Sequence, residues 1–359
     1  MAERVTMRDI AARMDVSVNT VHKVLTGKPG VSESLRKRVI ACAENMGYRR
    51  NTSASNLRRA KKTVAVLIPG PEGEGHYYYS YLWRGVEEYQ EEAGDVLMLD
   101  RRPYQIGAYG KALSDLLKEC LEGQRIDGVL AYAPSDEASL SILAQLGKTG
   151  VPIELLDGDQ HVPGRIGCMV ADYATAGALM AEQAANILAD RGGDILLLAG
   201  DSQVKSHSEV CEGFSTFLDA SKCNCCVEHV YGAHTEVELL RNKVNAILER
   251  SRRPALACSV FAVGSEVLCQ GLHEHCLDGQ IPAIGSDLFP ESIEALRQGT
   301  FCNLIYKDPC GLAFKAMETL GNYLLWGEKP EEQVSRGQVE MVFRSNLPQY
   351  CRHMGFPLN

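Results

Sequence analysis

The sequence predicts a small all-α head followed by an α/β body that contains two doubly wound parallel sheets. The first fifty residues hold three amphipathic stretches at helical spacing, separated by short turns. From Thr63 onward, short apolar runs alternate with longer helical patterns, which is typical of parallel strands joined by helices. The chain of 359 residues also exceeds what one hydrophobic core ordinarily supports, so we expect several domains.

Charge is distributed very unevenly along the chain. Residues 1–62 contain fourteen Lys and Arg against five Asp and Glu, whereas the remainder contains 23 basic and 41 acidic residues. A basic segment gains affinity for a phosphate backbone by releasing counterions, and an acidic body is repelled by the same polyanion. The charge pattern therefore predicts nucleic-acid contact at the N-terminal head.

The N-terminal residues and the cysteines indicate the compartment. The opening MAERVTMRDIAARM carries a charge every few residues, and no run of ~18 apolar residues occurs anywhere. The thirteen cysteines are typical of buried small hydrophobic residues in a chain of this length. We expect a cytoplasmic, nucleoid-associated protein with reduced cysteines and no membrane contact.

The first two predicted helices are very close together. Thr6 can cap a helix that begins at Met7, and Ser17 can cap a second helix that ends near Thr26 and Gly27. Only a three-residue turn separates them. This arrangement is the helix-turn-helix unit, whose second helix enters the major groove of DNA.

The second helix has an apolar face and a polar face. Asn19 suits adenine, His22 and Lys23 suit guanine acceptors or phosphate, and Val18 can touch a thymine methyl group. The opposite face and a third helix, capped by Ser32 and ending at Gly47, supply the apolar side chains of a miniature core: Val21, Val24, Leu25, Leu35, Val39, Ile40, Ala43 and Met46.

The segment VTMRDIAARMDVSVNTVHKVLTGKPGVSESLRKRVIACAENMGY resembles, almost position by position, the headpiece of the lactose-repressor (LacI/GalR) family of bacterial transcription regulators. The resemblance implies a sequence-specific repressor of carbohydrate-related genes. It implies a homodimer or tetramer that binds a palindromic operator in double-stranded DNA under the control of a small-molecule effector. The residues expected to contact DNA are Thr6, Ser17, Val18, Asn19, Thr20, His22, Lys23, Ala54, Leu57 and Arg58.

The last three of these lie in the linker NTSASNLRR, which resembles the hinge helix of that family. There Ala54 and Leu57 match the small position and the wedge position, and the wedge enters the minor groove and kinks the duplex. Ser55 stands where the family has a basic residue, so phosphate contact falls to Arg58 or Arg59. The alternative is a flexible basic tether.

The body is expected to form two lobes, and ligands of such sheets lie at the carboxyl ends of the strands, here in the cleft between lobes. We expect a head over residues 1–50, a hinge over 51–62 and a body over 63–345. Lobe 1 is assigned residues 63–171 and 304–330, and lobe 2 residues 172–303 and 331–359. The expected strands are TVAVLIP, DVLMLD, GVLAY and VPIELLD, then DILLLAG, VEHVY, ALACSV, IPAIGSD and CNLIY. The expected helices are Tyr81 to Ala93, two that end at Glu122 and Gly147, one after Ser208, one that ends at Arg250 and one after Ser265.

The body resembles the periplasmic sugar-binding-protein fold, and IYKDPCGLAFKA resembles its ribose-type branch. The resemblance places Asp157, Asp287 and Lys307 in the cleft. An Asp287 carboxylate can accept hydrogen bonds from adjacent hydroxyl groups, although its alternative role is a helix N-cap. The other candidate effector contacts are Tyr78, Lys205, His207 and Ser265. Tyr77, Tyr79 and Trp83 form an aromatic wall beside Tyr78 or pack in the core.

Three positions depart from the family pattern. Val210 replaces an Arg, Gly264 and Ser265 replace an Asn-Asp pair, and Lys307 replaces a Gln. The lost Arg and gained Lys leave room for an anionic ligand. We therefore expect a sugar, a sugar acid or a phosphosugar as effector.

Other classes of function find little support. The glycines after the first strand lack the third glycine of a dinucleotide fingerprint, Lys111 is followed by Ala112 rather than Ser or Thr, and no G-x-S-x-G elbow occurs. We expect no enzyme activity and no cofactor. Cys223, Cys225 and Cys226 near His229 have poor spacing for zinc. The remaining alternative is a solute-binding sensor that acts through a protein partner.

Overall fold

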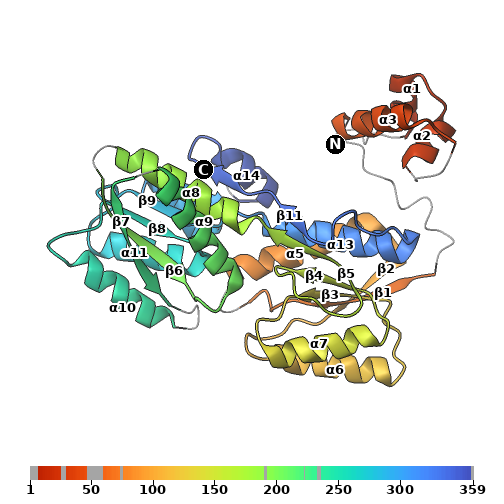
Figure 1. The fold of residues 1–359 in the computed structure, drawn as a ribbon, viewed down its shortest axis with the longest axis horizontal. Coiled ribbons are helices and arrows are strands. Elements are labelled where there is room, and N and C mark those ends of the chain that lie inside the picture. Colours follow the sequence, from red (N-terminus) through yellow and green to blue (C-terminus); the bar gives the residue numbers. More distant parts are fainter. Residues whose placement is uncertain are drawn as a thin grey trace. The chain divides into compact units, whose positions relative to one another are not determined.

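The computed structural model describes residues 7–25, 30–46, 60–72, 76–189, 192–221, 223–232 and 236–356. These residues form two compact units, one built on the N-terminal helices and the other on two β-sheets (Figure 1). Within the described ranges, no helix combines the length and the apolar character that a membrane span requires.

The head contains the three predicted helices, α1 (Met7–Met14), α2 (Val18–Leu25) and α3 (Glu33–Asn45). Asp15, at φ 52°, forms the turn between α1 and α2. Ser17 Oγ then accepts a hydrogen bond from the Thr20 N–H at 3.0 Å and so caps α2, as predicted. The buried side chains of the head are Ile10, Ala11, Val21, Val24, Val39 and Ala43.

The first sheet of the body is entirely parallel and has the order β11-β5-β4-β3-β1-β2. Its strands are β1 (Lys62–Leu67), β2 (Leu97–Arg101), β3 (Gly128–Tyr132), β4 (Ile153–Leu156), β5 (Arg165–Ala171) and β11 (Ser335–Gly337). In Figure 1, α6 (Tyr109–Leu121) and α7 (Glu137–Lys148) cover one face, while α5 (His76–Ala93) and α13 (Pro309–Trp326) cover the other. A short 3-10 turn, η1 (Gly94–Val96), leads into β2.

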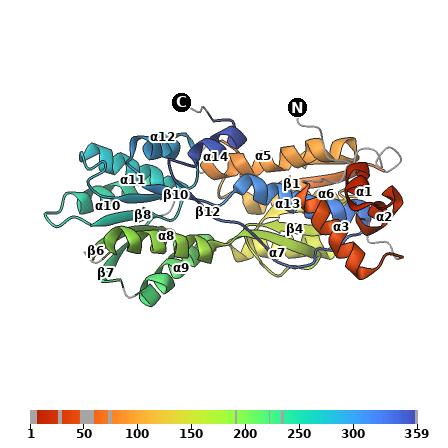
Figure 2. The same ribbon diagram turned by 90° about the horizontal axis from the view of Figure 1, so that it is seen from above.

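The second sheet repeats this arrangement with the order β12-β10-β9-β8-β6-β7, and only the β10–β12 pair is antiparallel. Its strands are β6 (Gly193–Gly200), β7 (Cys225–Tyr231), β8 (Leu256–Ser259), β9 (Ala283–Ser286), β10 (Asn303–Tyr306) and β12 (Glu340–Val342). Figure 2 shows α8 (Tyr173–Leu188) and α9 (Lys205–Ser221) on one face of this sheet. The other face carries α10 (Val237–Leu248), α11 (Ala262–Glu274) and α12 (Pro290–Gln298).

The repeated topology places one aspartate at the same point in each lobe. Asp157 follows β4 and Asp287 follows β9, and these are the equivalent strands of the two sheets. Their φ angles are 68° and 67°. Their N–H groups donate to the next strand, to Met169 O and Ile305 O, both at 2.8 Å. Asp157 and Asp287 therefore have the same backbone conformation at equivalent positions of the two sheets.

Several predicted boundaries need correction. β10 belongs to the second sheet and β11 to the first, so the lobe boundaries expected at 304 and 331 are wrong at these two strands. The body also continues beyond residue 345 into α14 (Leu347–Met354), where Arg297 Nη2 lies 3.8 Å from Cys351 Sγ. Three helices begin three to five residues before their predicted starts, at His76, Lys205 and Ala262.

Candidate ligand-binding cleft and recognition helix

A cavity of about 730 Å³ lies between the two lobes. Its walls come from loops that follow the carboxyl ends of strands in both sheets, as expected for an open α/β sheet. Six of the seven predicted effector residues line it: Tyr78, Asp157, Lys205, His207, Asp287 and Lys307.

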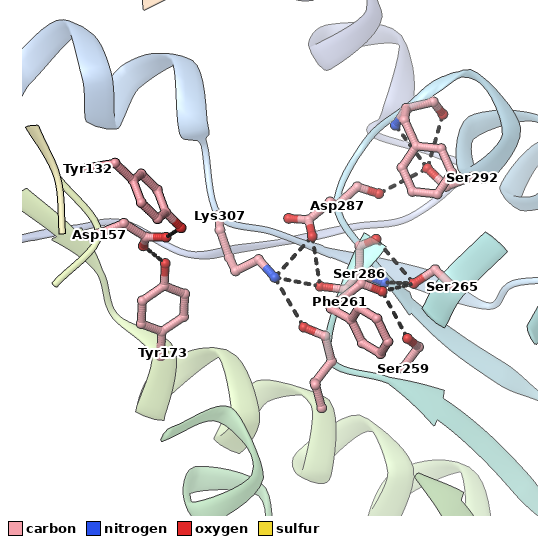
Figure 3. A network of polar contacts seen from close by, with 12 residues as sticks. Tyr132, Asp157, Tyr173, Ser259, Phe261, Ser265, Ser286, Asp287, Ser292 and Lys307 are labelled. Atoms are coloured by element: carbon pink, nitrogen blue, oxygen red, sulfur yellow. Dashed lines mark hydrogen bonds and ion pairs between the residues drawn. The ribbon is translucent and has the colours of Figure 1, made fainter. Parts of the chain in front are cut away.

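Asp157 is held by two tyrosines on the lobe 1 side of the cavity. The hydroxyl groups of Tyr132 and Tyr173 each donate a short hydrogen bond to one of its carboxylate oxygens (Figure 3). Burial raises the pKa of Asp157 to about 7, because the Tyr132 hydrogen bond and the Lys307 charge offset desolvation only in part. Near neutral pH this carboxyl group is poised to gain or lose a proton.

Lys307 and Asp287 form a buried ion pair on the lobe 2 side. Lys307 Nζ lies 3.0 Å from Asp287 Oδ2, and it also donates to Ser286 Oγ at 2.8 Å and to Val260 O at 3.2 Å (Figure 3). The three N–H groups of the ammonium are thus used within the protein. Burial raises the pKa of Asp287, while Lys307 and Ser286 act in the opposite direction.

The alternative role of Asp287 as a helix N-cap is not supported. α12 begins at Pro290 and Phe289 occupies its N-cap position. The Phe289 N–H donates to Ser292 Oγ at 3.0 Å, so the first turn is satisfied without Asp287. The Oδ1 atom of Asp287 is buried and has no hydrogen-bond partner among the described residues.

Ser265 is not part of the cavity wall, so its prediction as an effector contact is wrong. The helix that carries it starts at Ala262, which turns Ser265 inward and leaves it fully buried. Its Oγ accepts a hydrogen bond from the Ser286 N–H at 2.8 Å and donates to Phe261 O at 3.1 Å. Ser265 therefore fixes the end of β9, directly before Asp287.

Lys205 and His207 lie at the start of α9. Lys205 Nζ is 2.7 Å from Asp159 Oδ1, so it links the second lobe to the loop after β4 at the rim of the cavity. His207 packs against Phe261 with a ring-centroid distance of 4.9 Å. Its Nδ1 accepts a hydrogen bond from the Asp201 N–H at 3.1 Å, which leaves Nε2 as the protonated ring nitrogen of the neutral form.

The aromatic wall is larger than the sequence indicated. Tyr78 and Tyr79 line it as expected, and so do four tyrosines that were not predicted, together with one phenylalanine: Tyr104, Tyr109, Tyr132, Tyr173 and Phe261. The position of Tyr132 at the end of a strand could have identified it. Two predicted members lie elsewhere, because Tyr77 donates to Glu266 and Trp83 donates to Pro69 O in the core.

The departures from the family pattern have structural counterparts. Val210 contributes a buried apolar surface to the cavity where the family has a guanidinium group. A Cβ atom at Gly264 would lie 2.4 Å from the Phe261 ring, so the backbone of α11 can pack this closely against the ring only because residue 264 is a glycine. Neither Val210 nor Gly264 supplies a polar side chain to the cavity.

The outer face of α2 carries the candidate DNA contacts of the head. Val18 is 44% exposed, Asn19 is exposed and Lys23 is half-buried. Thr20 is half-buried, and its hydroxyl lies 2.8 Å from Ser17 Oγ. The remaining predicted DNA contacts, Thr6, Ala54, Leu57, Arg58 and the side chain of His22, lie outside the described residues.

Cys223, Cys225 and Cys226 lie at the start of β7 and in the loop before it. Cys225 begins the edge strand β7 and Cys226 is exposed. Among the residues that the structure describes, no group of three His, Cys, Asp or Glu side chains is arranged to hold a metal ion.

Comparisons with known proteins match both parts of the chain. Residues 6–51 match "Bacterial regulatory proteins, lacI family", and residues 67–329 match "Periplasmic binding protein domain". Catabolite control protein A of Priestia megaterium is 26% identical over 75% of this chain and 76% of its own. The HTH-type transcriptional repressor PurR of Photobacterium profundum is also 26% identical, over 70% of this chain and 72% of its own.

Solved structures share the fold of the body. GanP, a glucose-galactose binding protein from Geobacillus stearothermophilus, superposes with a TM-score of 0.69 at 15% identity, over 81% of this chain and all of its own. A putative LacI transcriptional regulator from Bacteroides fragilis gives a TM-score of 0.67 at 17% identity, over 81% and 99% of the two chains. The two matched regions together cover most of the sequence. The chain therefore belongs to the lacI family of bacterial transcription regulators, with a body of the periplasmic-binding-protein fold.

Proposed function

We propose that the protein is a repressor of carbohydrate-related genes that binds a palindromic operator as a homodimer and is switched by a small polyhydroxylated molecule in the cleft. It would act in the cytoplasm at the chromosome. The observation that carries this proposal is that one chain combines a lacI-type head, with an exposed polar face on α2, and a cavity between two lobes that is lined by aromatic rings and by the buried Asp157, Asp287 and Lys307.

The geometry of α2 supports DNA reading by the head. Val21 and Val24 are buried against α1 and α3, so the helix presents Val18, Asn19 and Lys23 outward. Arg36 of α3 donates to Val24 O at 3.1 Å and ties the carboxyl end of α2 to the rest of the head. A rigidly held helix with an Asn and a Lys on its outer face suits the major groove.

A dimer follows from the size of the head. One helix-turn-helix unit reads only a few base pairs, whereas two-fold symmetry doubles the site and makes it palindromic. A sensor that acts through a protein partner instead of DNA is not favoured, because the head matches a family of DNA-binding regulators.

The polar atoms of the cavity support a ligand rich in hydroxyl groups. Lys307, which led us to expect an anionic ligand, is already paired with the Asp287 carboxylate and donates a further hydrogen bond to Ser286 Oγ within the protein. The buried atoms left without partners in the described structure include Asp287 Oδ1, Gln160 Oε1 and Tyr78 Oη. Hydroxyl groups can donate to each of them.

Selection of operator sequences from a random DNA library with the purified full-length protein tests the proposal. The expected result is a palindromic site bound by two copies of the chain. The Asn19→Ala variant should lose about 1 to 3 kcal/mol of binding free energy on that site and little on random DNA. Tight binding of a single copy to one half-site, or equal losses on both DNAs, would contradict the proposal.

A further inference from the structure

We propose that the ligand of the cleft carries a positive charge, and that it is a hydroxylated amine such as an amino sugar whose ammonium group binds beside Asp157 among the surrounding tyrosine rings. This inference rests on the proposed function and specifies the chemistry of its effector. It is carried by the charges, the unpartnered atoms and the aromatic side chains of the cavity.

The cavity is lined by one more carboxyl group than lysine. Four carboxylates face three lysines there: Asp136, Glu137, Asp157 and Asp287 against Lys111, Lys205 and Lys307. In the buried part, Lys307 is paired with Asp287, and Lys205 is paired at the rim with Asp159 and Glu209. Asp157 has no cationic side chain within ion-pair distance in the described part of the chain. A ligand cation would supply the missing partner.

The protein makes Asp157 costly to ionise while it is alone. A buried carboxylate without a cation is unfavourable, and its two hydrogen bonds come from neutral tyrosine hydroxyls. Asp287 also lies close enough to oppose its ionisation. An ammonium group placed beside Asp157 would offset both effects, whereas a phosphate or carboxylate would add a third negative charge.

The unpartnered atoms call for a ligand that donates hydrogen bonds. Asp287 Oδ1 and Gln160 Oε1 can only accept, and both are buried in the cavity wall. The hydroxyls of Tyr132 and Tyr173 bond Asp157 and the Lys307 ammonium bonds three oxygens, so these donors are already used. The unpartnered Tyr78 hydroxyl can either donate or accept. A protonated amine brings three donors and each sugar hydroxyl brings one, while an ionised phosphate brings few or none.

Aromatic rings surround the proposed ammonium position. Tyr79 and Tyr132 meet edge to face at 5.6 Å between ring centroids, and Tyr78 meets Tyr79 at 6.0 Å. Tyr78 lines the same cavity as Asp157 and Asp287, and its buried hydroxyl has no hydrogen-bond partner among the described residues. Burial and the charges of these two carboxylates raise the pKa of Tyr78. Tyrosine rings attract cations through their faces, and a carboxylate among them strengthens that preference.

Binding of matched sugars by isothermal titration calorimetry tests the inference. The probes are glucosamine, galactosamine and mannosamine, each compared with its parent hexose, its N-acetyl derivative and its 6-phosphate, at about pH 6.5, where amines are protonated. The expected result is that at least one amine binds the full-length protein at least about tenfold more tightly than its parent hexose. N-acetylation should remove that advantage, because it removes the charge.

Two aspartate variants show whether the preference comes from Asp157. Asp157→Asn keeps the shape of the side chain but removes its charge, so the amine should lose at least about tenfold more affinity than the parent hexose and the preference for the amine should disappear. Asp201→Asn is the matched control at the end of β6, and it should keep the preference because Asp201 is not on the cavity wall. Melting temperatures of both variants establish that they are folded.

The outcomes separate this inference from the proposed function. If the hexoses or their 6-phosphates bind more tightly than every amine, if no amine binds, or if Asp157→Asn keeps the preference, the inference about charge is wrong. The proposed function survives each of these results as long as the protein selects a palindromic operator. Failure to select any DNA site would instead contradict the proposed function, whatever the sugar data show.

Discussion

Asp157 and Asp287 both adopt a backbone conformation that L-residues with a side chain seldom use. Positive φ angles are uncommon outside glycine, although aspartate tolerates them better than most residues. Here the two angles differ by one degree, and both residues follow the fourth strand of their sheet in chain order. The conformation turns each side chain out of its strand and toward the shared cavity. Glycine would satisfy the backbone more easily at both positions, but it would supply no carboxylate.

The Asp287–Lys307 pair should be far more sensitive to removal of one partner than to removal of both. Asp287→Ala leaves a buried ammonium without its counter-charge, so we expect a loss of about 3 to 5 kcal/mol in the free energy of unfolding. The double variant Asp287→Ala with Lys307→Met removes both charges and should recover most of that loss. Urea denaturation of the single and double variants measures the difference. Additive losses would show that the two side chains do not interact as the 3.0 Å distance indicates.

Glu154 is a second buried carboxyl group, and it lies in β4 away from the cavity wall. It is 1% exposed, and burial raises its pKa to about 8. Between about pH 4.3, the usual pKa of a glutamate, and pH 8, Glu154 is protonated in the folded protein and ionised in the unfolded chain. The free energy of unfolding should therefore fall as the pH rises from about 4.3 to about 8, and it should change no further through Glu154 above pH 8.

Glu154→Gln cannot ionise, so it should be more stable than the wild type at pH values above 8 by a few kcal/mol, on the order of 3 to 5. The difference should shrink toward zero near pH 5. Thermal unfolding across this range measures it, with the exposed Glu122→Gln as the control that leaves the profile unchanged. Parallel profiles for wild type and Glu154→Gln would mean that Glu154 is ionised throughout in the folded protein.

The site residues that the sequence revealed are those that follow a clear strand. Asp157, Asp287 and Lys307 each stand directly after an apolar run, so their place at the sheet edge could be predicted. Ser265 was misplaced because it was taken from the family pattern as a residue that follows a strand, whereas it lies in the first turn of α11 with its side chain buried. Tyr104 and Tyr109 could not be recognised, because they lie in and after a loop whose path is set by tertiary packing.

At the scale of elements, most strands with an apolar run and several helices were predictable, whereas β5, α8, α12, α13 and the short strands β11 and β12 were not predicted. β11 and β12 have three residues each and no apolar alternation, so only their pairing with β5 and β10 defines them. Their pairing also decides which lobe each segment joins. A local pattern carries no information about such long-range pairing, which explains why β11 was assigned to the wrong lobe. The apolar strand β10 was recognised, but its pairing with β9 was equally hidden, so its lobe was also misjudged.

The N-cap of α2 provides a prediction at this scale. Ser17→Ala removes the hydrogen bond to the Thr20 N–H and should lower the stability of the head by about 1 kcal/mol. Because the whole helix frays, affinity should fall on cognate and random DNA together, unlike the selective loss expected for Asn19→Ala. Ser17→Asp restores a cap and should recover stability, but its added negative charge should still weaken DNA binding. Binding assays on both DNAs distinguish these cases, and an unchanged melting temperature for Ser17→Ala would show that the cap is unimportant.

At the scale of the whole molecule, the two lobes are topological copies that each supply one aspartate to a common cavity. A ligand that contacts Asp157 and Asp287 at once must hold the lobes in one relative arrangement. The exposed Lys205–Asp159 pair also spans the lobes, but an exposed ion pair contributes only about 0 to 1 kcal/mol. The ligand, rather than this surface pair, is therefore expected to dominate the balance between lobe arrangements.

A ligand can shift DNA affinity only through different affinities for the two lobe arrangements. The coupling must be reciprocal, so the factor by which the ligand changes operator affinity equals the factor by which the operator changes ligand affinity. Asp287→Asn keeps the shape of the side chain but removes the charge that bonds Lys307, and it should reduce both factors toward one. Operator affinity without ligand should stay near the wild-type value, because the head itself is unchanged. Titrations of operator and of the best-binding sugar, each with and without the other, measure both factors. If Asp287→Asn leaves unchanged the factor by which ligand alters operator affinity, then Asp287 does not distinguish the two lobe arrangements. The different affinities for the two arrangements would then come from Asp157 and the tyrosines around it.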